Sequence, residues 1–283
     1  MLKMPEHAFL IRKLRKERGF TQEQLTMGIS QRGTLAAFES RGTKISFELL
    51  INYLEKMNVT LEEYEFLLNE GSLSPKQKLT NYFLTTPGLT SAQEDELLKE
   101  YEKTGNIFYR LLYAQRKIIL NHLENKATTP EVKKEIQLIM NYLEHIDTWG
   151  RFELSIFSRC LFIFKTDYIV RSFYHSVTKM GIYQDTTVQQ NLLANFILNG
   201  VRLSFTRSSA TLRTLFLTEL KKLAELHTNS LNIAYYKIFS ALDRLAQGDQ
   251  SAIAEIDQGI HFFDWLGLTA MTDFIIRLKT TYS

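Results

Sequence analysis

Apolar residues recur every three or four positions along most of this chain, without sustained alternation of apolar and polar residues. A period near 3.6 residues is typical of amphipathic helices, whereas half-buried strands alternate with a period of about two. The pattern therefore predicts an all-α fold. The N-terminal helices are expected at about residues 6–18, 22–27 and 31–40, then after Ser46 and from near Leu61.

Helix-breaking residues divide the chain into two predicted domains. Residues 69–75 (NEGSLSP) interrupt the helical pattern, and Pro75 suits the first turn of a following helix. We expect a five-helix domain over residues 1–70 and a larger helical domain over residues 75–283. A chain of 283 residues with 45% hydrophobic residues is long and apolar enough for two folded domains.

The later helices are predicted to form pairs. First helices are expected near Thr148, Thr186 and Asn229, and second helices near Lys165, Ala210 and Gln250. A helical hairpin repeated about every 40 residues is typical of a tetratricopeptide-like solenoid, in which the first helix of each pair lines a concave face. An irregular helical domain is the alternative, because spacing alone does not specify how helices stack.

The segment from Thr21 to Gly42 predicts a helix-turn-helix. It combines a short helix capped by Thr21, a tight turn at residues 28–30 and a second helix. The second helix of such a motif enters the major groove of DNA, where an arginine can bind guanine and a glutamine can bind adenine. The predicted base-reading residues are Gln31, Arg32 and Thr34.

The distribution of charge adds candidate phosphate contacts. Residues 1–45 have nine Lys or Arg against four acidic residues, whereas residues 46–70 have one Lys against six Glu. A basic block beside an acidic block indicates a small domain with one anion-binding face, although the net charge of the whole chain is only +3. The predicted phosphate contacts are Arg12, Gln22, Arg41 and Lys44, with Gln22 at a helix N-terminus.

Arg15 and Glu39 are predicted to form a buried ion pair. In a helix-turn-helix layout these side chains face each other beneath the DNA-reading helix, so their pairing fixes the angle between the first and third helices. Loss of one partner would leave the other charge buried without compensation. The alternative for the whole segment is a solvated pair of amphipathic helices with no role in DNA binding.

The sequence also resembles a known family. The segments LIRKLRKERGFTQEQL (residues 10–25) and GISQRGTLAAFESRGTKIS (residues 28–46) resemble the Xre-type helix-turn-helix. The short GIS turn, FESRG and TWGRFELSIF (residues 148–157) narrow this resemblance to the Rgg family (Rgg/GadR/MutR) of transcriptional regulators. The resemblance implies a cytoplasmic homodimer that binds a DNA operator and has a helical repeat domain for a short imported signalling peptide.

A peptide groove would need apolar pockets and side chains that pair with peptide amides. Asparagine suits the second task because its amide both donates and accepts hydrogen bonds. The predicted peptide contacts on the first helices of the pairs are Arg151, Asn191, Asn195 and Asn232. Arg151 is equally compatible with a surface charge.

The sequence shows no grouping of residues typical of a catalytic or metal-binding site. No two of the six His stand at metal-ligand spacing, and the single cysteine, Cys160, lies in an apolar helix typical of an inert thiol. No apolar stretch approaches the roughly 20 residues of a membrane span. We therefore expect no catalytic site, metal, cofactor or membrane association, and a location in the cytoplasm.

The C-terminal residues 260–268 concentrate large apolar side chains, among them Phe262, Phe263 and Trp265. Such an excess predicts a capping or homodimer surface, with burial in the core as an equal alternative. Two other classes of protein remain open: a helical-repeat adaptor without an operator, and a partner in a toxin–antitoxin pair.

Overall fold

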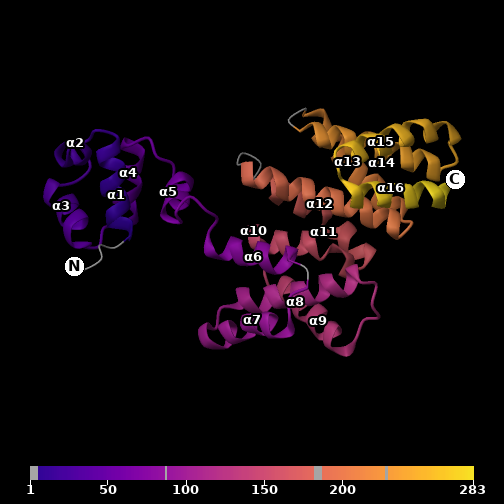
Figure 1. Cartoon of the computed structure of the whole chain (residues 1–283), viewed down its shortest axis with the longest axis horizontal. Helices are drawn as coiled ribbons and strands as arrows, with labels where there is room; N and C mark the ends of the chain where they lie inside the picture. Colours follow the sequence, from indigo (N-terminus) through magenta and orange to yellow (C-terminus); the bar gives the residue numbers. More distant parts are fainter. Residues whose placement is uncertain (1–5, 87, 182–186, 227–228) are drawn as a thin grey trace. The chain divides into compact units, whose positions relative to one another are not determined.

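The computed structural model describes residues 6–86, 88–181, 187–226 and 229–283, without the side chains at 181 and 187–191 (Figure 1). Within these residues every regular element is a helix, which confirms the predicted all-α fold. The chain divides into two compact units, Met1–Thr90 and Ser91–Ser283. The second unit begins later than the expected domain start at Pro75, because the helix that begins there belongs to the first unit.

The first unit contains the five predicted helices and one more. They are α1 (Glu6–Glu17), α2 (Gln22–Thr26), α3 (Arg32–Arg41), α4 (Phe47–Lys56), α5 (Leu61–Leu68) and α6 (Pro75–Thr85). Thr21 caps α2 in a capping box with Gln24, and the Ser46 side chain caps α4. Gly42 ends α3 with a φ of 65°, a left-handed conformation that glycine adopts without a Cβ clash. The helix ends therefore follow from local sequence.

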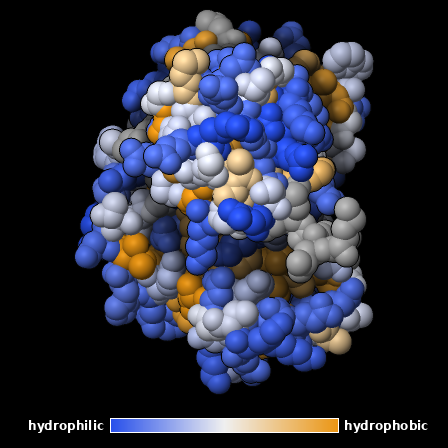
Figure 2. All heavy atoms as spheres, turned by 90° about the vertical axis from the view of Figure 1, so that its left-hand side faces the viewer, coloured by the Kyte–Doolittle hydropathy of each residue, from blue (hydrophilic) through white to orange (hydrophobic). Residues whose placement is uncertain are grey.

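The core of the first unit joins four of these helices. Ile11 of α1, Leu25 of α2, Leu35 of α3 and Tyr53 of α4 are fully buried in one cluster. On the face of the molecule shown in Figure 2, hydrophilic side chains predominate and hydrophobic ones form small separate patches. The apolar pattern of the sequence is thus largely buried between helices.

The second unit is a succession of helices that pack on their neighbours in the chain. They are α7 (Ser91–Thr104), α8 (Ile107–Leu123), α9 (Pro130–Glu144), α10 (Arg151–Arg159), η1 (Leu161–Ile163), α11 (Thr166–Gly181), α12 (Thr187–Thr206), α13 (Ala210–Glu225), α14 (Ser230–Ala246), η2 (Gln250–Ala252), α15 (Ile253–Trp265) and α16 (Thr269–Tyr282). Helix α12 packs along α13, α13 along α14, and α15 along α16. The predicted pairs are α10/α11, α12/α13 and α14/α15, so the tetratricopeptide-like arrangement is confirmed.

The first helices of successive pairs also meet one another. Helix α10 packs on α12, and α14 packs on α16. Asn199 of α12 donates from Nδ2 to the Ser158 carbonyl of α10 at 3.1 Å. The Phe205 ring of α12 lies 5.9 Å from the Phe239 ring of α14. We call the side formed by α10, α12, α14 and α16 the inner face, because the first helices of successive pairs line the concave surface of such a solenoid.

Helices α12 and α13 approach closely at a glycine. A Cβ on Gly200 of α12 would lie 2.1 Å from Cε1 of Phe216 in α13. Phe216 is fully buried, with the Phe173 and Phe196 rings 4.9 and 5.3 Å away, so it has no free space into which to move. Gly200 therefore sets the separation of the two helices of this pair.

The predicted ion pair between Arg15 and Glu39 is present in the first unit. Arg15 Nε and Nη2 donate to the two carboxylate oxygens of Glu39 at 2.6 and 2.7 Å. The two residues are only 7% and 2% exposed. Arg15 Nη1 also donates to the Phe20 carbonyl at 2.7 Å, and Gln22 Nε2 donates to Glu39 at 2.9 Å. The network therefore connects α1, α2 and α3.

The Glu39 carboxylate is held in its charged form. Burial by itself raises the pKa of Glu39, but the hydrogen bonds from Arg15 and Gln22 and the charge of Arg15 outweigh it and lower that pKa below its ordinary value. A carboxylate whose pKa is lower in the folded than in the unfolded state stabilises the fold at pH values above its unfolded-state pKa. This stability is lost as the pH falls through the folded-state pKa. The ion pair is thus intact at neutral pH.

We expect Arg15→Ala to reduce the free energy of unfolding by about 3–5 kcal/mol, because Glu39 then stays buried without its cation. Arg18→Ala is the control: its partner is Glu63, their side chains are 28% and 42% exposed, and such surface pairs contribute about 0–1 kcal/mol. Urea denaturation followed by circular dichroism measures both variants. Equal losses in the two variants would contradict the structural role of Arg15.

Candidate functional site

The predicted base-reading residues lie together at the start of α3. Gln31 is the N-cap residue, and its side chain makes no capping hydrogen bond. Gln31, Arg32 and Thr34 are all exposed, and within the described residues no hydrogen bond or ion pair occupies their side chains. Leu35 and Phe38 are buried on the other side of the helix. Helix α3 thus presents three polar side chains that are free to contact a ligand.

The turn before α3 is held by the rest of the first unit. Gly28 has a φ of 78°, which permits the sharp change of direction after α2. The Ile29 and Ser30 amides both donate to the Thr26 carbonyl, at 2.9 and 3.0 Å. The Ser30 hydroxyl lies 2.6 Å from the Tyr53 hydroxyl of α4. These contacts fix where α3 begins.

The predicted phosphate contacts fall into two groups. Arg41 and Lys44 are exposed at the C-terminal end of α3 and just beyond it, and Arg12 is half-buried on α1. Gln22 differs, because its Nε2 donates to the Glu39 carboxylate. Gln22 therefore belongs to the ion-pair network, a link that spacing in the sequence did not indicate.

The predicted peptide contacts are unevenly exposed. Arg151, the first residue of α10, and Asn195 of α12 are exposed, and neither side chain has a polar partner in the part of the chain that the structure describes. Asn232 of α14 is only 7% exposed. The Asn191 side chain lies outside the described residues. Arg151 and Asn195 thus offer unpaired polar groups on helices of the inner face.

Arg151 lies at the N-terminal end of α10, where hydrogen bonds hold the neighbouring residues in place. Glu153 accepts from the Gly150 amide at 2.9 Å and from the Tyr142 hydroxyl at 2.7 Å. Burial and this bond to Glu153 raise the pKa of Tyr142. Trp149 is nearly buried, and its Nε1 donates to the Leu143 carbonyl at 3.0 Å. Arg151 itself has no acidic partner among the described residues.

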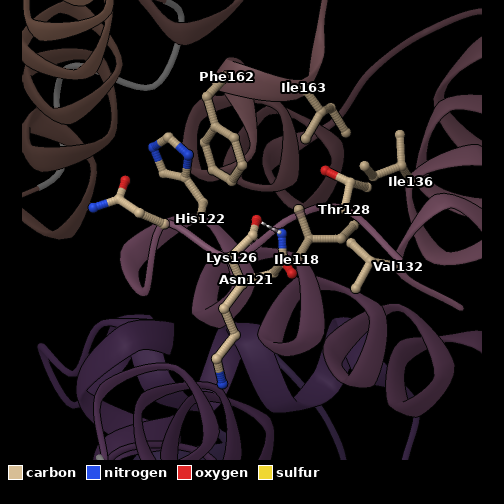
Figure 3. A pocket seen from close by; sticks show the side chains of 10 residues that line it. Ile118, Asn121, His122, Lys126, Thr128, Val132, Ile136, Phe162 and Ile163 are labelled. Atoms are coloured by element: carbon tan, nitrogen blue, oxygen red, sulfur yellow. Dashed lines mark hydrogen bonds between the residues drawn. The ribbon is translucent and has the colours of Figure 1, made fainter. Parts of the chain in front are cut away.

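A cavity of about 380 Å³ opens where α8 ends and α9 begins (Figure 3). The His122 ring stacks on Phe162 with 3.9 Å between the ring centroids, and partial burial lowers the pKa of His122. The one cation at its rim, Lys126, is paired with Glu124 at 2.7 Å. The remaining lining residues are Ile118, Asn121, Asn125, Thr128, Val132, Ile136 and Ile163. Polar and apolar residues line the cavity in equal number, and no sequence pattern predicted it.

Neither a cluster of metal ligands nor a reactive thiol is present among the described residues. No group of three or more His, Cys, Asp or Glu among them could hold a metal ion. Cys160 is fully buried, and burial raises the pKa of its thiol to about 12, which keeps it in the unreactive protonated form. In the same residues no helix is both long and apolar enough to cross a membrane.

Comparison with solved structures places the whole chain in one group of folds. The SHP pheromone receptor Rgg2 of Streptococcus dysgalactiae has 18% identity and a TM-score of 0.76, over 98% of this chain and 100% of that one. A putative transcriptional regulator from Listeria monocytogenes EGD-e has 18% identity and a TM-score of 0.76, over 99% and 98%. The PrgX/cCF10 complex has 16% identity and a TM-score of 0.71, over 99% and 100%. No curated protein sequence matches the chain.

Family models match both units of the chain. A helix-turn-helix model matches residues 11–64, which contain α2, the turn and α3. The model for the C-terminal domain of the HTH-type transcriptional regulator Rgg matches residues 94–275, well over half of the chain. The predicted resemblance is therefore confirmed, and the chain belongs to the Rgg family of helix-turn-helix transcriptional regulators.

Proposed function

We propose that this protein binds a DNA operator through α3 and that a short peptide on the inner face of the second unit controls its activity. The observation that supports this most directly is the free polar edge of α3, formed by Gln31, Arg32 and Thr34 on a helix that the Arg15–Glu39 pair holds in place. A fixed helix with free donors at its N-terminal end suits the reading of base edges.

The charge of the first unit supports a DNA partner. The basic residues 1–45 include Arg12, Arg41 and Lys44, which we propose as phosphate contacts. Gln22 contributes as a positioning residue, through its bond to Glu39. Phosphate contacts set the orientation of the protein, whereas Arg32 and Gln31 supply discrimination between bases. Operator binding implies a location in the cytoplasm.

The second unit supports a peptide ligand. Two relatives in fold are described as a pheromone receptor and as a complex with cCF10. In this chain Arg151 and Asn195 present unpaired polar groups on α10 and α12, which pack on each other. An apolar peptide must still pair its backbone amides when it is buried, and these side chains provide partners. We propose Asn191 and Asn232 as further contacts, although Asn232 exposes little surface.

The exposed apolar residues at the C-terminal end support a homodimer. Trp265 is 81% exposed and Ile276 is 43% exposed. Large aromatic side chains in such positions are typical of interfaces. We propose that a second copy of the chain covers these residues.

We also propose that the protein has no catalytic activity and binds no metal or cofactor.

We expect Arg32→Ala to lower the discrimination between a selected operator and random duplex by about 1–3 kcal/mol, because a bidentate contact to a base is lost. The operator is first selected by the wild-type chain from a pool of randomised duplexes, and fluorescence anisotropy then measures binding. The melting temperature should not change, since Arg32 has no partner in the described residues. Unchanged discrimination would remove Arg32 from the base-reading surface.

The matched control for this test is Lys44→Ala. Loss of a phosphate contact should weaken binding to every duplex alike and reduce the slope of log affinity against log salt by about one. A wild-type chain whose duplex binding is independent of salt would favour a protein–protein adaptor instead.

We expect Arg151→Ala and Asn195→Ala each to weaken peptide binding about tenfold, because a buried donor or acceptor on the peptide loses its partner. The probe is the tightest octapeptide that the wild-type chain selects from a synthetic pool rich in Leu, Ile and Val, and calorimetry measures its affinity. Lys221→Ala is the control, since Lys221 lies on α13, outside the inner face, and pairs with Glu225. Wild-type affinity in both test variants would place the peptide elsewhere.

We expect Trp265→Asp to convert a dimer into monomers at micromolar concentration, because a charge replaces a buried apolar contact. Sedimentation velocity measures the mass of the chain in solution. Leu123→Asp is the control, since Leu123 of α8 is equally an exposed apolar residue, at 69% exposure. A wild-type monomer would refute the proposed dimer.

A further inference from the structure

Most cations on the last helices of the second unit are neutralised by acidic partners. Arg213 pairs with Asp243 at 2.8 Å, and Lys279 pairs with Asp257 at 2.6 Å. Arg244 pairs with both Asp249 and Glu255. Arg202 and Arg277 depart from this rule, since in the described part of the chain neither has a carboxylate within ion-pair distance. Arg207, just after α12, also lacks one, but its guanidinium donates to the Phe162 carbonyl instead.

Arg202 and Arg277 lie close together although 75 positions separate them in the sequence. The Arg202 guanidinium of α12 lies over the Phe274 ring of α16, 5.1 Å from its centroid. Phe274 and Arg277 are three residues apart in α16 and so share one face of that helix. The ring therefore brings Arg202 onto the face of α16 from which Arg277 projects.

The surroundings of Arg202 disfavour an isolated positive charge. Burial lowers the pKa of Arg202, the nearby Arg277 charge lowers it further, and Tyr235 of α14 acts in the opposite direction. An arginine nevertheless stays protonated at neutral pH. Two like charges thus lie near each other with no carboxylate of the described residues within ion-pair distance of either. Solvent screens part of their repulsion because both side chains are exposed, and a bound anion would replace the remaining repulsion by attraction.

We propose that Arg202 and Arg277 form an anion subsite on the inner face that binds a carboxylate of the peptide ligand, with the Tyr235 hydroxyl as a further donor. The planar guanidinium offers paired donors that match the two oxygens of a carboxylate. The apolar face of Phe274 beside them suits a peptide whose other residues are apolar. This inference rests on the proposed peptide function.

The subsite has a defined place along the groove. Asn195 and Arg202 are seven residues apart on α12, which is two helical turns and puts them on the same face. At a rise of about 1.5 Å per residue they are separated by about 10 Å along the helix axis. An extended peptide covers that distance with about three residues. The acidic group is therefore expected about three residues from the position whose backbone Asn195 pairs.

Three pools of synthetic octapeptides of Leu, Ile, Val and Gly test the subsite with the full-length protein. The first has blocked ends and one Asp, the second has blocked ends and one Asn, and the third has no Asp but a free C-terminal carboxylate. Affinity selection followed by mass spectrometry measures retention. We expect the wild-type chain to retain the first or the third pool about tenfold more than the second, and the preferred pool identifies the source of the carboxylate.

In the double variant Arg202→Gln, Arg277→Gln this preference should disappear. Lys237→Gln should retain it, because Lys237 follows Tyr235 by two residues and so points about 200° away around α14. Equal retention of all three pools by the wild-type chain would overturn the subsite and leave the peptide function standing. Retention of none would overturn both. A preference that survives the double variant would place the carboxylate elsewhere.

The ligand-free protein gives a separate readout. Removal of one of two like charges should leave the melting temperature of Arg277→Gln equal to or above that of the wild-type chain. A residue with only a structural role would lower the melting temperature when it is replaced. A clear decrease in Arg277→Gln would therefore show that Arg277 has an internal partner, and it would overturn the proposal without any peptide.

Discussion

The buried pair between Arg15 and Glu39 is the constraint on which the DNA-reading surface depends. A carboxylate in the core is stable only beside its cation, so α1 and α3 cannot shift relative to each other without breaking two charged hydrogen bonds. Gln22 extends this restraint to α2. The buried side of α3, through Leu35 and Glu39, therefore determines how its opposite edge faces the solvent. Specificity at that edge needs such rigidity, because a contact to a base is lost with a small displacement.

The second unit achieves order by different means. Aromatic rings such as Phe173, Phe196 and Phe216 fill the space between helix pairs, and Gly200 allows the closest approach. Packing of this kind involves the faces through which neighbouring helices contact each other. It does not require the side chains on the inner face to be apolar. Polar residues there can remain without internal partners at little cost when they are exposed. Arg151, Asn195 and Arg202 illustrate this, since all three are exposed. Arg202 differs from the other two because it lies over the Phe274 ring and near a second cation, Arg277.

Sequence reasoning succeeded where the cause was local. The caps at Thr21 and Ser46 and the stop at Gly42 were predictable because each residue acts within one turn of its own helix. It did not reveal features that depend on how distant helices align. These are the close approach of α12 and α13 at Gly200, the cavity beside Phe162 and the ion pairs of buried Glu94 with Arg116 and Lys117. Asn232 lies on α14, the expected first helix of its pair, but its burial depends on neighbours that periodicity does not identify.

A ligand can change the state of a protein only by the difference in its affinity for the two states. Contacts between apolar peptide residues and the inner face are non-directional, so they restrain the distance between α12 and α16 only weakly. A carboxylate held by Arg202 and Arg277 differs, because its two partners stand on α12 and α16 and repel each other without it. Its binding replaces that repulsion by attraction to a shared anion, which favours states in which the two helices lie close. In this arrangement the apolar residues of the peptide provide affinity. Its carboxylate makes the distance between α12 and α16 depend on whether the peptide is bound.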